Sequence, residues 1–576
     1  MKRLFFTLMA LLLIFSACQK KHQDLTINIL ETTDVHGQLF PYNFVYNDTA
    51  DHSLAQAYTY IKHIRANTDQ ATILLDNGDI IQGDPSVYYY NFVDTTDQHI
   101  VSRMFNYMGY DAATVGNHDI EAGHKVYDRL VKEFDFPWLS ANTVSTATGK
   151  PYFQPYVILH RGDIKIAVLG LTTPGIPNWL PPVLYKGMRF DDMIQTARHW
   201  VKIIKEKEHP DLIIGLFHAG HDWTYDGQDS SQCCNENATL LVAKKVPGFD
   251  LILCGHDHDV FMQYVKTDWG DSVLVIDPGS KARYVGHATI KLTWDPDKKV
   301  YKKLVTGKII ATDTIKPDPD FIHKFWPDFL KVKKYVSDTI GILTDTLDGR
   351  KAYFGDNTFI DLIHRVQLKV SGAQLSFAAP LGYKPIIPAG PVTVGQMFAL
   401  YRYENMLYTM RLKGSEIKKY LEYSYSLWAN TMHSPNDHLL LMDDKGHLKN
   451  RYYNFDNAQG INYTVDVTKP AGQRITITGL SNGQPFDTAA YYTVAINSYR
   501  GNGGGGHLVR GAGIPKDSLQ ARLIHSTDRD IRYYIMQYFR QKKVVTPTKD
   551  NNWRFIPQDW ANKAALRDYS LLFSNN

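Results

Sequence analysis

The sequence predicts an α/β protein with two large domains, and three observations carry this prediction. The chain has 576 residues, more than one ordinary domain contains. Its composition, 44% hydrophobic and 21% charged, is typical of a globular chain that buries real cores. In the first half, short apolar runs alternate with helical periodicity, as in layered α/β folds. The apolar runs cover residues 25–30, 71–75, 111–115, 164–171, 212–217 and 251–254, and the helical patterns cover 192–206 and 238–246.

The N-terminus has the layout of a secretory signal. Two basic residues precede an apolar run over residues 4–15, which is too short to span a membrane permanently. The Ser-Ala-Cys sequence that ends at Cys18 resembles a bacterial lipobox, so residues 1–18 are predicted to be a lipoprotein-type signal peptide. Phe15 stands where leucine is more usual, which leaves ordinary signal-peptidase cleavage as the alternative. We therefore expect a periplasmic or outer-membrane protein that meets the membrane only through a lipid anchor.

Charge and cysteine content exclude two other classes of protein. A net charge of +4 gives no strong field for a polyanion, so no nucleic-acid polymer is expected as a partner. The chain has four cysteines, and Cys18 is the predicted lipidation site, so the remaining three give no disulfide framework. Cys233 and Cys234 are adjacent, and Cys254 ends an apolar run, where a small core residue is expected.

The predicted secondary structure changes near residue 316, where the first domain is expected to end. The sequence Lys-Pro-Asp-Pro at 316–319 interrupts a strand-rich stretch, and a mostly helical segment follows in which Pro327 predicts a kink or restart. Further on, residues 356–370 have a helical pattern, and 475–480 and 491–499 read as strands. The predicted segments are 24–315 for the first domain, 316–346 for a linker helix, 347–547 for the second domain and 548–576 for an unassigned tail.

Residues of the kinds that bind metal ions follow the apolar runs of the first domain. In open α/β folds, ligands gather at the carboxyl ends of strands, so these segments are expected to converge. Scattered polar loop residues are the alternative for any one of them, but five clusters in the same context favour a common site. The clusters are Asp34 with His36, Asp79, Asn117-His118-Asp119, His218, and His256 with His258.

This mixture of carboxylate, amide and imidazole groups suits phosphate-ester hydrolysis by two metal ions. The reaction must neutralise negative charge on the phosphoryl group and generate hydroxide at neutral pH. Two divalent ions roughly 3.5–4 Å apart do both. A carboxylate that bridges the ions is needed between flanking imidazoles, and Asp79 is the natural bridge.

These segments resemble the signature of the calcineurin-like metallophosphoesterases in the form used by 5′-nucleotidases. That family reads D-x-H, G-D, G-N-H-[DE], H and G-H-x-H in order, and this chain reproduces all five. The second half resembles the C-terminal domain of the same family, so the likeness covers nearly the whole mature chain. Four segments are most similar to the branch of 2′,3′-cyclic-nucleotide 2′-phosphodiesterase/3′-nucleotidases: ETTDVHG, NGDIIQGDP, ENATLLVAKKVPGFDLILCGHDH and YNFDNAQGINYTVDVTKP.

The resemblance implies a fold, two metal ions and a catalytic histidine. The fold is a four-layer α/β/β/α metallophosphoesterase domain, a long linker helix and a mixed α/β C-terminal nucleotidase domain. His118 is then left to stabilise the transition state or protonate the leaving oxygen. Glu121 is its predicted partner, with Asp119 as the alternative. One divalent ion (Mn, Zn, Fe, Co or Ca) would be held by Asp34, His36, Asp79 and His258, and the other by Asp79, Asn117, His218 and His256.

The resemblance also implies how a nucleotide binds. Family members stack the base between two aromatic rings, for which Phe455 and Tyr499 are the candidates, with Tyr453 in place of Phe455 as an alternative and core packing as another. Asn117 is expected to contact the substrate as well. Family 5′-nucleotidases carry arginines in a segment that corresponds to 375–383 here, and this segment has none.

The missing arginines favour 2′,3′-cyclic and 3′-nucleotides over 5′-nucleotides. We therefore expect two-metal hydrolysis of a 2′,3′-cyclic nucleotide to the 3′-nucleotide, and then to nucleoside and phosphate. The alternatives are a 5′-nucleotidase or UDP-sugar hydrolase, a thiosulfate-ester hydrolase on the same fold, and a surface binding lipoprotein without catalysis. Nucleotide substrates are the expected partners of a monomeric protein.

Overall fold

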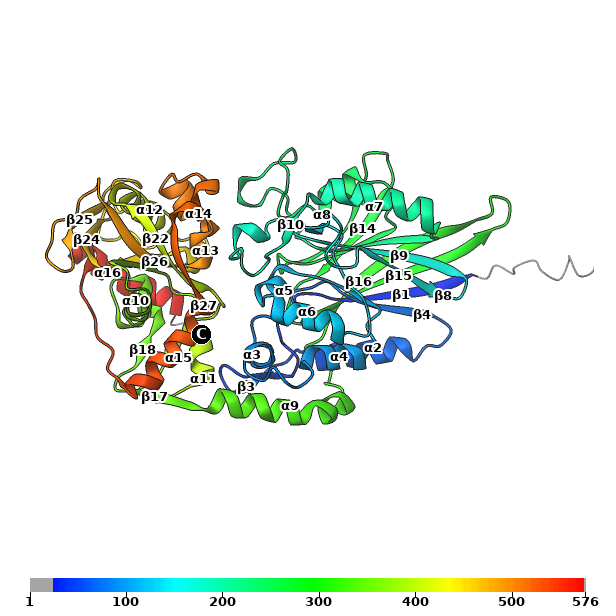
Figure 1. Cartoon of the computed structure of the whole chain (residues 1–576), viewed down its shortest axis with the longest axis horizontal. Coiled ribbons are helices and arrows are strands. Elements are labelled where there is room, and N and C mark those ends of the chain that lie inside the picture. Colours follow the sequence, from blue (N-terminus) through cyan, green and yellow to red (C-terminus); the bar gives the residue numbers. More distant parts are fainter. Residues whose placement is uncertain (1–23, 574–576) are drawn as a thin grey trace, which may run out of the picture.

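The computed structural model describes residues 24–573 and consists of two α/β units joined by a long helix (Figure 1). The N-terminal unit lies on the right of the figure and the C-terminal unit on the left. The predicted signal peptide and Cys18 lie outside the described residues. Among residues 24–573, no helix combines the length and the apolar character needed to cross a membrane.

Two six-stranded sheets form the centre of the N-terminal unit. Strand order is β16-β15-β1-β4-β5-β6 in one sheet and β13-β14-β12-β11-β9-β8 in the other. The first sheet contains β1 (Leu25–Thr32), β4 (Ala71–Asp76), β5 (Ala112–Thr114), β6 (Trp138–Leu139), β15 (Tyr284–Asp295) and β16 (Val300–Ala311). The second contains β8 (Tyr156–Arg161), β9 (Ile164–Thr172), β11 (Leu212–His218), β12 (Leu251–Cys254), β13 (Val260–Lys266) and β14 (Ser272–Pro278).

Alternating apolar residues pack these sheets against each other and against helices. Ile29 and Ile73 point into the core shared with Ile214 of the other sheet, while Leu30 and Leu74 point to the opposite face. That outer face is covered by α2 (Leu54–Arg65), α4 (Ile100–Met108) and α6 (His124–Glu133), and the outer face of the second sheet by α7 (Met193–Glu208) and α8 (Thr239–Lys245). The predicted α/β/β/α layering is therefore confirmed.

The strands that matter for the site run in the same direction. Strands β1, β4 and β5 pair in parallel, with Thr32 opposite Asp76 near the strand ends. Strands β9, β11 and β12 of the second sheet are parallel as well. Their carboxyl ends bring the following loops to the edge of the sandwich that faces the C-terminal unit, where α5 (Asn117–Glu121) lies (Figure 1).

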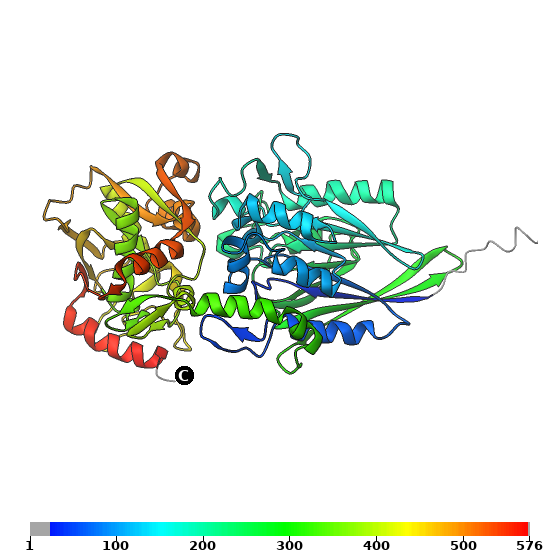
Figure 2. The same ribbon diagram turned by 60° about the horizontal axis from the view of Figure 1, so that its bottom comes forward.

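Helix α9 (Pro319–Ser337) connects the two units. Asp318 caps its N-terminus by accepting a hydrogen bond from the amide of Phe321. The helix runs through Pro327 without a break and ends at Ser337, before strand β17 (Thr339–Leu343), so it is shorter than the linker helix predicted over 316–346. Its buried phenylalanines belong to the core of the N-terminal unit, so the connector is fixed to that unit along its length (Figure 2).

A five-stranded sheet forms the centre of the C-terminal unit. Its order is β23-β19-β26-β22-β27, with bounds Asn457–Gln459, Leu375–Ala378, Tyr491–Asn497, Met406–Lys413 and Leu523–Asp530. Helices α10 (Thr358–Ser371), α12 (Gly414–Trp428) and α15 (Ile531–Lys542) pack around it. The predicted helix over 356–370 and the predicted strands over 475–480 and 491–499 are observed as α10, β25 (Ile475–Leu480) and β26.

The segment predicted to be an unassigned tail is part of this unit. Strand β29 (Trp553–Ile556) pairs in parallel with β24 (Ile461–Asp466), which places Trp553 opposite Tyr463. Helix α16 (Gln558–Phe573) then buries Ala564 and Leu572 in the same core. Residues 548–573 therefore complete the C-terminal unit.

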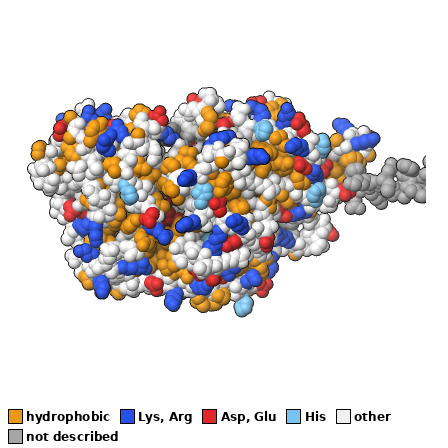
Figure 3. All heavy atoms as spheres, in the orientation of Figure 1, with side chains coloured by type: hydrophobic (Ala, Val, Ile, Leu, Met, Phe, Trp, Pro, Cys, Tyr) orange, Lys and Arg blue, Asp and Glu red, His pale blue; other side chains and the backbone are white. Residues whose placement is uncertain are grey.

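Side chains from both units meet at their boundary. The hydroxyl of Tyr88 on α3 (Pro85–Phe92) donates to Asp530 at 3.1 Å, and the guanidinium of Arg532 lies 4.6 Å from the Tyr88 ring. The side-chain amide of Asn502 donates to the carbonyl of Trp179 at 3.2 Å. On the face drawn in Figure 3, side chains of both charges are interspersed among hydrophobic ones over both units.

Candidate metal centre

Left-handed backbone at the strand ends turns the predicted ligands toward one another. Few residues other than glycine adopt positive φ, and such residues gather at functional sites. Gly116 allows a close approach between two of these loops, since a Cβ at this position would lie 2.1 Å from Oδ1 of Asp79. Positive φ values occur at Asp34 (49°), His36 (47°), Asp79 (55°), His256 (87°) and His258 (63°).

Two groups of side chains that share Asp79 form at this edge. Asp34, His36, Asp79 and His258 each offer one atom, and these atoms lie within 4.8 Å of one another. Asp79, His218 and His256 form a second group of the same kind. The predicted amide ligand of the second group adjoins it, because Oδ1 of Asn117 lies 3.1 Å from Nε2 of His218. The arrangement brings all seven predicted ligands together.

The two aspartates each keep one oxygen without a hydrogen bond. Oδ2 of Asp34 accepts from Thr33 and from the amide of His256, and Oδ1 of Asp79 accepts from the amide of His118. Oδ1 of Asp34 and Oδ2 of Asp79 are buried and have no hydrogen-bond partner among the described residues. Such buried acceptors are costly unless something satisfies them. A divalent cation would satisfy them, so the residues present fit two metal ions, for which Asp79 would belong to both ligand sets.

Charge in the site favours the ionised aspartates. Burial raises the pKa of Asp34 and Asp79, but the surrounding imidazoles outweigh it. The pKa of Asp34 falls to about 2, and that of Asp79 lies well below its ordinary value. Both groups are therefore carboxylates, the form that binds a cation.

Backbone carbonyls orient two of the imidazoles. Nδ1 of His218 lies 2.6 Å from the carbonyl oxygen of Asn77, and Nδ1 of His36 lies 3.0 Å from that of Gln82. A proton on Nδ1 satisfies these carbonyls and leaves the Nε2 lone pair for the centre of the site. Nε2 of His218 is 3.2 Å from the unsatisfied oxygen of Asp79.

Glu121 and Asp119 have different positions relative to His118. Nδ1 of His118 lies 2.5 Å from Oε2 of Glu121, so the structure places the predicted partner against the ring. Asp119, the alternative, instead accepts from the amides of Gly116, Asp79, Ile80 and Ile81 at 2.8–3.2 Å. Burial lowers the pKa of His118, but the carboxylates of Asp79 and Glu121 raise it to about 9.

Glu236 is a site residue that the sequence did not single out. Its Oε1 lies 3.2 Å from Nε2 of His256, and the ring of Trp179 lies 5.6 Å from the same imidazole. Glu236 is the first residue of the segment ENATLLVAKKVPGFDLILCGHDH that resembles the family. An acidic residue in a loop just before a helix, however, shows no sequence pattern that would mark it as a site residue. Only the fold brings it to His256.

Lys281 and Arg402 place positive charge at the edge of the site from different units. The amide of Lys281 donates to the carbonyl of Asp34 at 2.8 Å. Burial lowers the pKa of Lys281 to about 8, and the nearby guanidiniums of Arg402 and Arg283 add to this. Arg402 comes from the C-terminal unit, so cations of both units lie around Lys281.

The aromatic candidates separate into one core residue and two partly accessible ones. Phe455 is fully buried, and Trp428 covers its face with parallel rings 5.5 Å apart. No face remains for a base, so the prediction that Phe455 stacks one is wrong. Tyr453, the alternative, and Tyr499 are half-buried. Burial and the neighbouring Tyr499 raise the pKa of Tyr453. Burial raises the pKa of Tyr499 to about 12, and Glu236 of the N-terminal unit adds to this.

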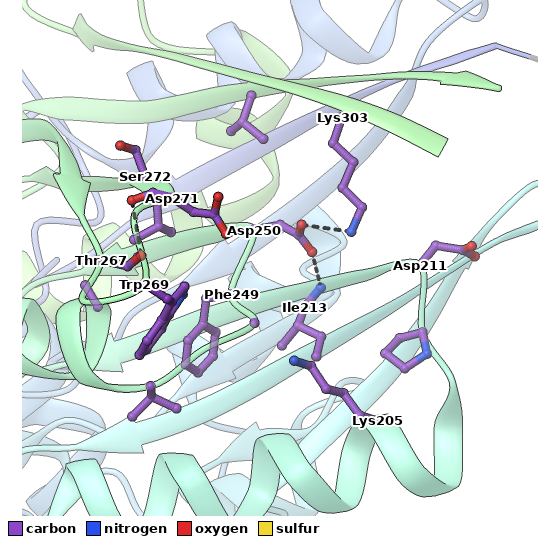
Figure 4. Close-up of a pocket in the computed structure, with 16 residues that line it drawn as sticks. Lys205, Asp211, Ile213, Phe249, Asp250, Thr267, Trp269, Asp271, Ser272 and Lys303 are labelled. Carbon is purple, nitrogen blue, oxygen red and sulfur yellow. Dashed lines mark hydrogen bonds and ion pairs between the residues drawn. The ribbon is translucent and has the colours of Figure 1, made fainter. Parts of the chain in front are cut away.

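A pocket of about 640 Å³ lies at the end of the second sheet that is opposite the predicted metal ligands (Figure 4). It is lined by residues at the start of β11 and β12, among them Ile213 and Asp250, and by Trp269 and Lys303. The carboxylate of Asp250 is already paired with Lys303 at 2.8 Å and with the amide of Ile213 at 2.9 Å. None of the predicted site residues lines this pocket.

The layered fold and the paired metal-type groups define a phosphoesterase. Residues 27–260 match the calcineurin-like phosphoesterase family, and residues 337–510 match the C-terminal domain of 5′-nucleotidases. The chain therefore carries a calcineurin-like phosphoesterase domain followed by a 5′-nucleotidase C-terminal domain.

Two relatives and one solved structure illustrate the similarity. The chain is 27% identical to a 2′,3′-cyclic-nucleotide 2′-phosphodiesterase/3′-nucleotidase of Haemophilus influenzae, over 96% of this chain and 90% of that protein. It is 28% identical to the trifunctional nucleotide phosphoesterase protein YfkN of Bacillus subtilis over 93% of this chain, which spans only 39% of that protein's length. The fold matches a putative 5′-nucleotidase from Staphylococcus aureus with a TM-score of 0.75 at 21% identity, covering 92% of this chain and 99% of the other.

Proposed function

We propose that the protein opens 2′,3′-cyclic nucleotides to 3′-nucleotides and then releases the 3′-phosphate. The observation that carries the proposal is a pair of buried carboxylate oxygens, one on Asp34 and one on Asp79, that have no hydrogen-bond partner among the described residues. Each lies 3.2 Å from an imidazole nitrogen, and the His118–Glu121 pair lies in the same site. The relative from Haemophilus influenzae bears the name of this activity and aligns with nearly the whole chain.

The seven ligands would hold two divalent ions in the sets given above. Bound ions supply a hydroxide at neutral pH and neutralise charge on the phosphoryl oxygens. Their identity is left open among Mn, Zn, Fe, Co and Ca, because mixed oxygen and nitrogen ligands suit all of them. Asn117 supplies an amide at the edge of the second set, where it can also meet the substrate.

His118 acts on the leaving oxygen. Glu121 holds its Nδ1, so Nε2 is the atom that faces the substrate. The His118 side chain is 28% exposed, which lets a phosphate ester reach it, whereas Glu121 is buried behind it. A proton on Nε2 stabilises charge on the phosphoryl group and passes to the oxygen that leaves.

Tyr453 and Tyr499 bind the base, and two cations bind the phosphate side. Stacking on aromatic rings contributes roughly 1–3 kcal/mol per base and tolerates different bases. The segment 375–383 lies largely in the core as β19 and its following turn, and it carries no arginine. The amide of Lys281 donates to the carbonyl of Asp34, and Arg402 lies close enough to lower the pKa of Lys281, so we assign these two cations to the phosphate.

A substrate panel on metal-reconstituted protein tests the activity. The protein is stripped with a chelator, reloaded with each candidate metal, and assayed on 2′,3′-cyclic AMP, 3′-AMP and 5′-AMP. We expect turnover of the first two to dominate. Dominant 5′-AMP hydrolysis would establish the 5′-nucleotidase alternative, which the match of residues 337–510 supports. If the protein hydrolyses none of the three nucleotides with any of the metals, the non-catalytic binding lipoprotein would be the remaining hypothesis.

We also propose that residues 1–18 are a lipoprotein signal and that Cys18 anchors the protein in the periplasm or outer membrane as a monomer. The domains proposed are 24–315, the connector 316–346 and the C-terminal domain from 347 onward. Radiolabelled palmitate should label wild type but not Cys18→Ala. Labelling that survives the substitution would refute the anchor.

A further inference from the structure

The loop between β11 and α8, residues 219–238, carries two adjacent cysteines shortly before Glu236, which contacts His256. Cys233 and Cys234 are exposed, while Cys254 is buried in the core. The Sγ atoms of the pair lie only 2.8 Å apart. This separation is below an ordinary contact of two sulfur atoms and above the disulfide bond length of about 2.05 Å. The two thiols are therefore already directed at each other.

The backbone around the pair is held in an unusual conformation. Cys234 has φ of 62°, a left-handed value that a residue with a Cβ seldom adopts. Its amide donates to Oδ2 of Asp192 at 3.1 Å, and Asp192 also caps helix α7. The pair is thus anchored to the N-terminal unit through a fixed helix end.

The same loop reaches the candidate metal centre two residues later. Glu236 contacts His256 at 3.2 Å, and its carbonyl accepts from Thr173 at 2.9 Å. On either side of it, the side-chain amides of Asn235 and Asn237 donate to carbonyls at the start of the loop, at 2.8 and 3.1 Å. Glu236, which touches a metal-type histidine, therefore lies two positions after Cys234 in a segment held by hydrogen bonds.

We propose that Cys233 and Cys234 are a reversible redox pair that closes to a disulfide and fixes Glu236 against His256. Adjacent Cα atoms are about 3.8 Å apart, closer than the roughly 4.4–6.8 Å usual for a disulfide. The closed ring is therefore strained, and strain makes a disulfide easy to reduce. This suits a switch rather than a permanent link.

The oxidant is a disulfide of a small thiol or of a thiol oxidoreductase. The Cys233 thiolate attacks one sulfur of that disulfide and releases a thiolate, which takes up a proton. The Cys234 thiolate then attacks the Cys233 sulfur and releases the second thiol. Burial, and then the contact with Cys233, raise the pKa of the Cys234 thiol. The product is one disulfide in the protein and two reduced thiols.

Thiol counting and hydrogen exchange on the full chain test the proposal without an activity assay. The protein is equilibrated with oxidised or reduced glutathione, denatured, alkylated and mapped by mass spectrometry. We expect the oxidised form to lose two titratable thiols. Its peptide spanning 233–234 should carry no alkyl group and weigh two hydrogen atoms less than the unmodified dithiol peptide, whereas the reduced form should carry two alkyl groups. Amide exchange across 219–238 should slow severalfold in the oxidised form.

The single variants Cys233→Ser and Cys234→Ser are the matched controls. Both positions are exposed, so folding should be kept, and exchange across the loop should no longer depend on the glutathione ratio. Three outcomes in wild type would overturn the proposal: glutathione adducts on both cysteines, disulfides between chains, or an internal disulfide that leaves exchange of the loop unchanged.

Discussion

Nδ1 of His118 lies 2.5 Å from Oε2 of Glu121, three residues further along the short helix α5. The spacing puts both side chains on one face of the helical turn. Asp119, between them, points the other way and accepts hydrogen bonds from the Asp79 loop. One helical turn therefore supplies a catalytic group on one face and a structural anchor on the other.

Glu121→Gln should lower kcat by about 100-fold, with little change in KM. The amide keeps the shape but not the negative charge that favours a protonated His118, and general acid catalysis is worth roughly 10²–10⁴-fold. Glu121→Asp keeps the charge on a shorter side chain and should retain more activity than Glu121→Gln. Steady-state kinetics on 3′-AMP measure this, with His118→Ala as the lower limit. Unchanged kcat in Glu121→Gln would remove the glutamate from the mechanism.

Metal content should distinguish the shared ligand from a ligand of one ion. Asp79→Asn should lose both ions, because the carboxylate belongs to both groups, whereas His258→Ala should keep one. Elemental analysis after dialysis gives the stoichiometry. A metal at a hundredfold excess over its Kd stabilises by about 2.7 kcal/mol per site. The rise of Tm on adding metal should thus be largest in wild type, smaller in His258→Ala and absent in Asp79→Asn. Equal metal content in both variants would contradict a bridging Asp79.

The positions of the metal-type residues could be predicted because they are local to strand ends. Asp79 and His218 each follow an apolar run, and parallel strands carry such ends to one edge of the sandwich. Glu236 could not be found this way. It lies in a loop with no periodic pattern, and only the folded loop brings it to His256.

The errors in the second half arise from contacts between distant segments. Phe455 is covered by Trp428, which ends helix α12 well before it in the chain, so its burial has no local signal. Strand β29 pairs with β24, and partners such as Tyr463 and Trp553 are 90 positions apart, which is why the pattern leaves residues 548–573 unassigned. In both cases tertiary packing decides what the sequence pattern leaves open.

Tyr499→Ala and Phe455→Ala should fail in different ways. Tyr499 is half-buried near Glu236, so its loss should raise KM for nucleotides about tenfold, in line with roughly 1–3 kcal/mol per stacked base. Its Tm should barely change, and Tyr499→Phe should keep the wild-type KM. Phe455→Ala empties a filled core site and should cost about 3–5 kcal/mol of unfolding free energy. A rise of KM in Phe455→Ala without loss of stability would restore the base-stacking role.

Asp119→Ala should destabilise the protein even without metal. The buried carboxylate accepts from four backbone amides of the Gly116 and Asp79 loops, and its loss leaves those amides without a partner. An unsatisfied buried donor costs about 1–3 kcal/mol, so we expect a loss of about 3 kcal/mol or more in urea unfolding of the stripped protein. Asp119→Asn should lose less, because its amide oxygen still accepts.

Glu206→Ala is the matched control for Asp119→Ala. Glu206 is 63% exposed and forms an ion pair with Lys202 at 3.9 Å, so its removal should change stability by less than about 0.5 kcal/mol. Asp119→Ala should also weaken metal binding by about 10–100-fold, because the anchored amide belongs to Asp79 itself. If stripped Asp119→Ala unfolds at the wild-type urea concentration, the carboxylate does not hold these loops, and the position of Asp79 must depend on the metal ions instead.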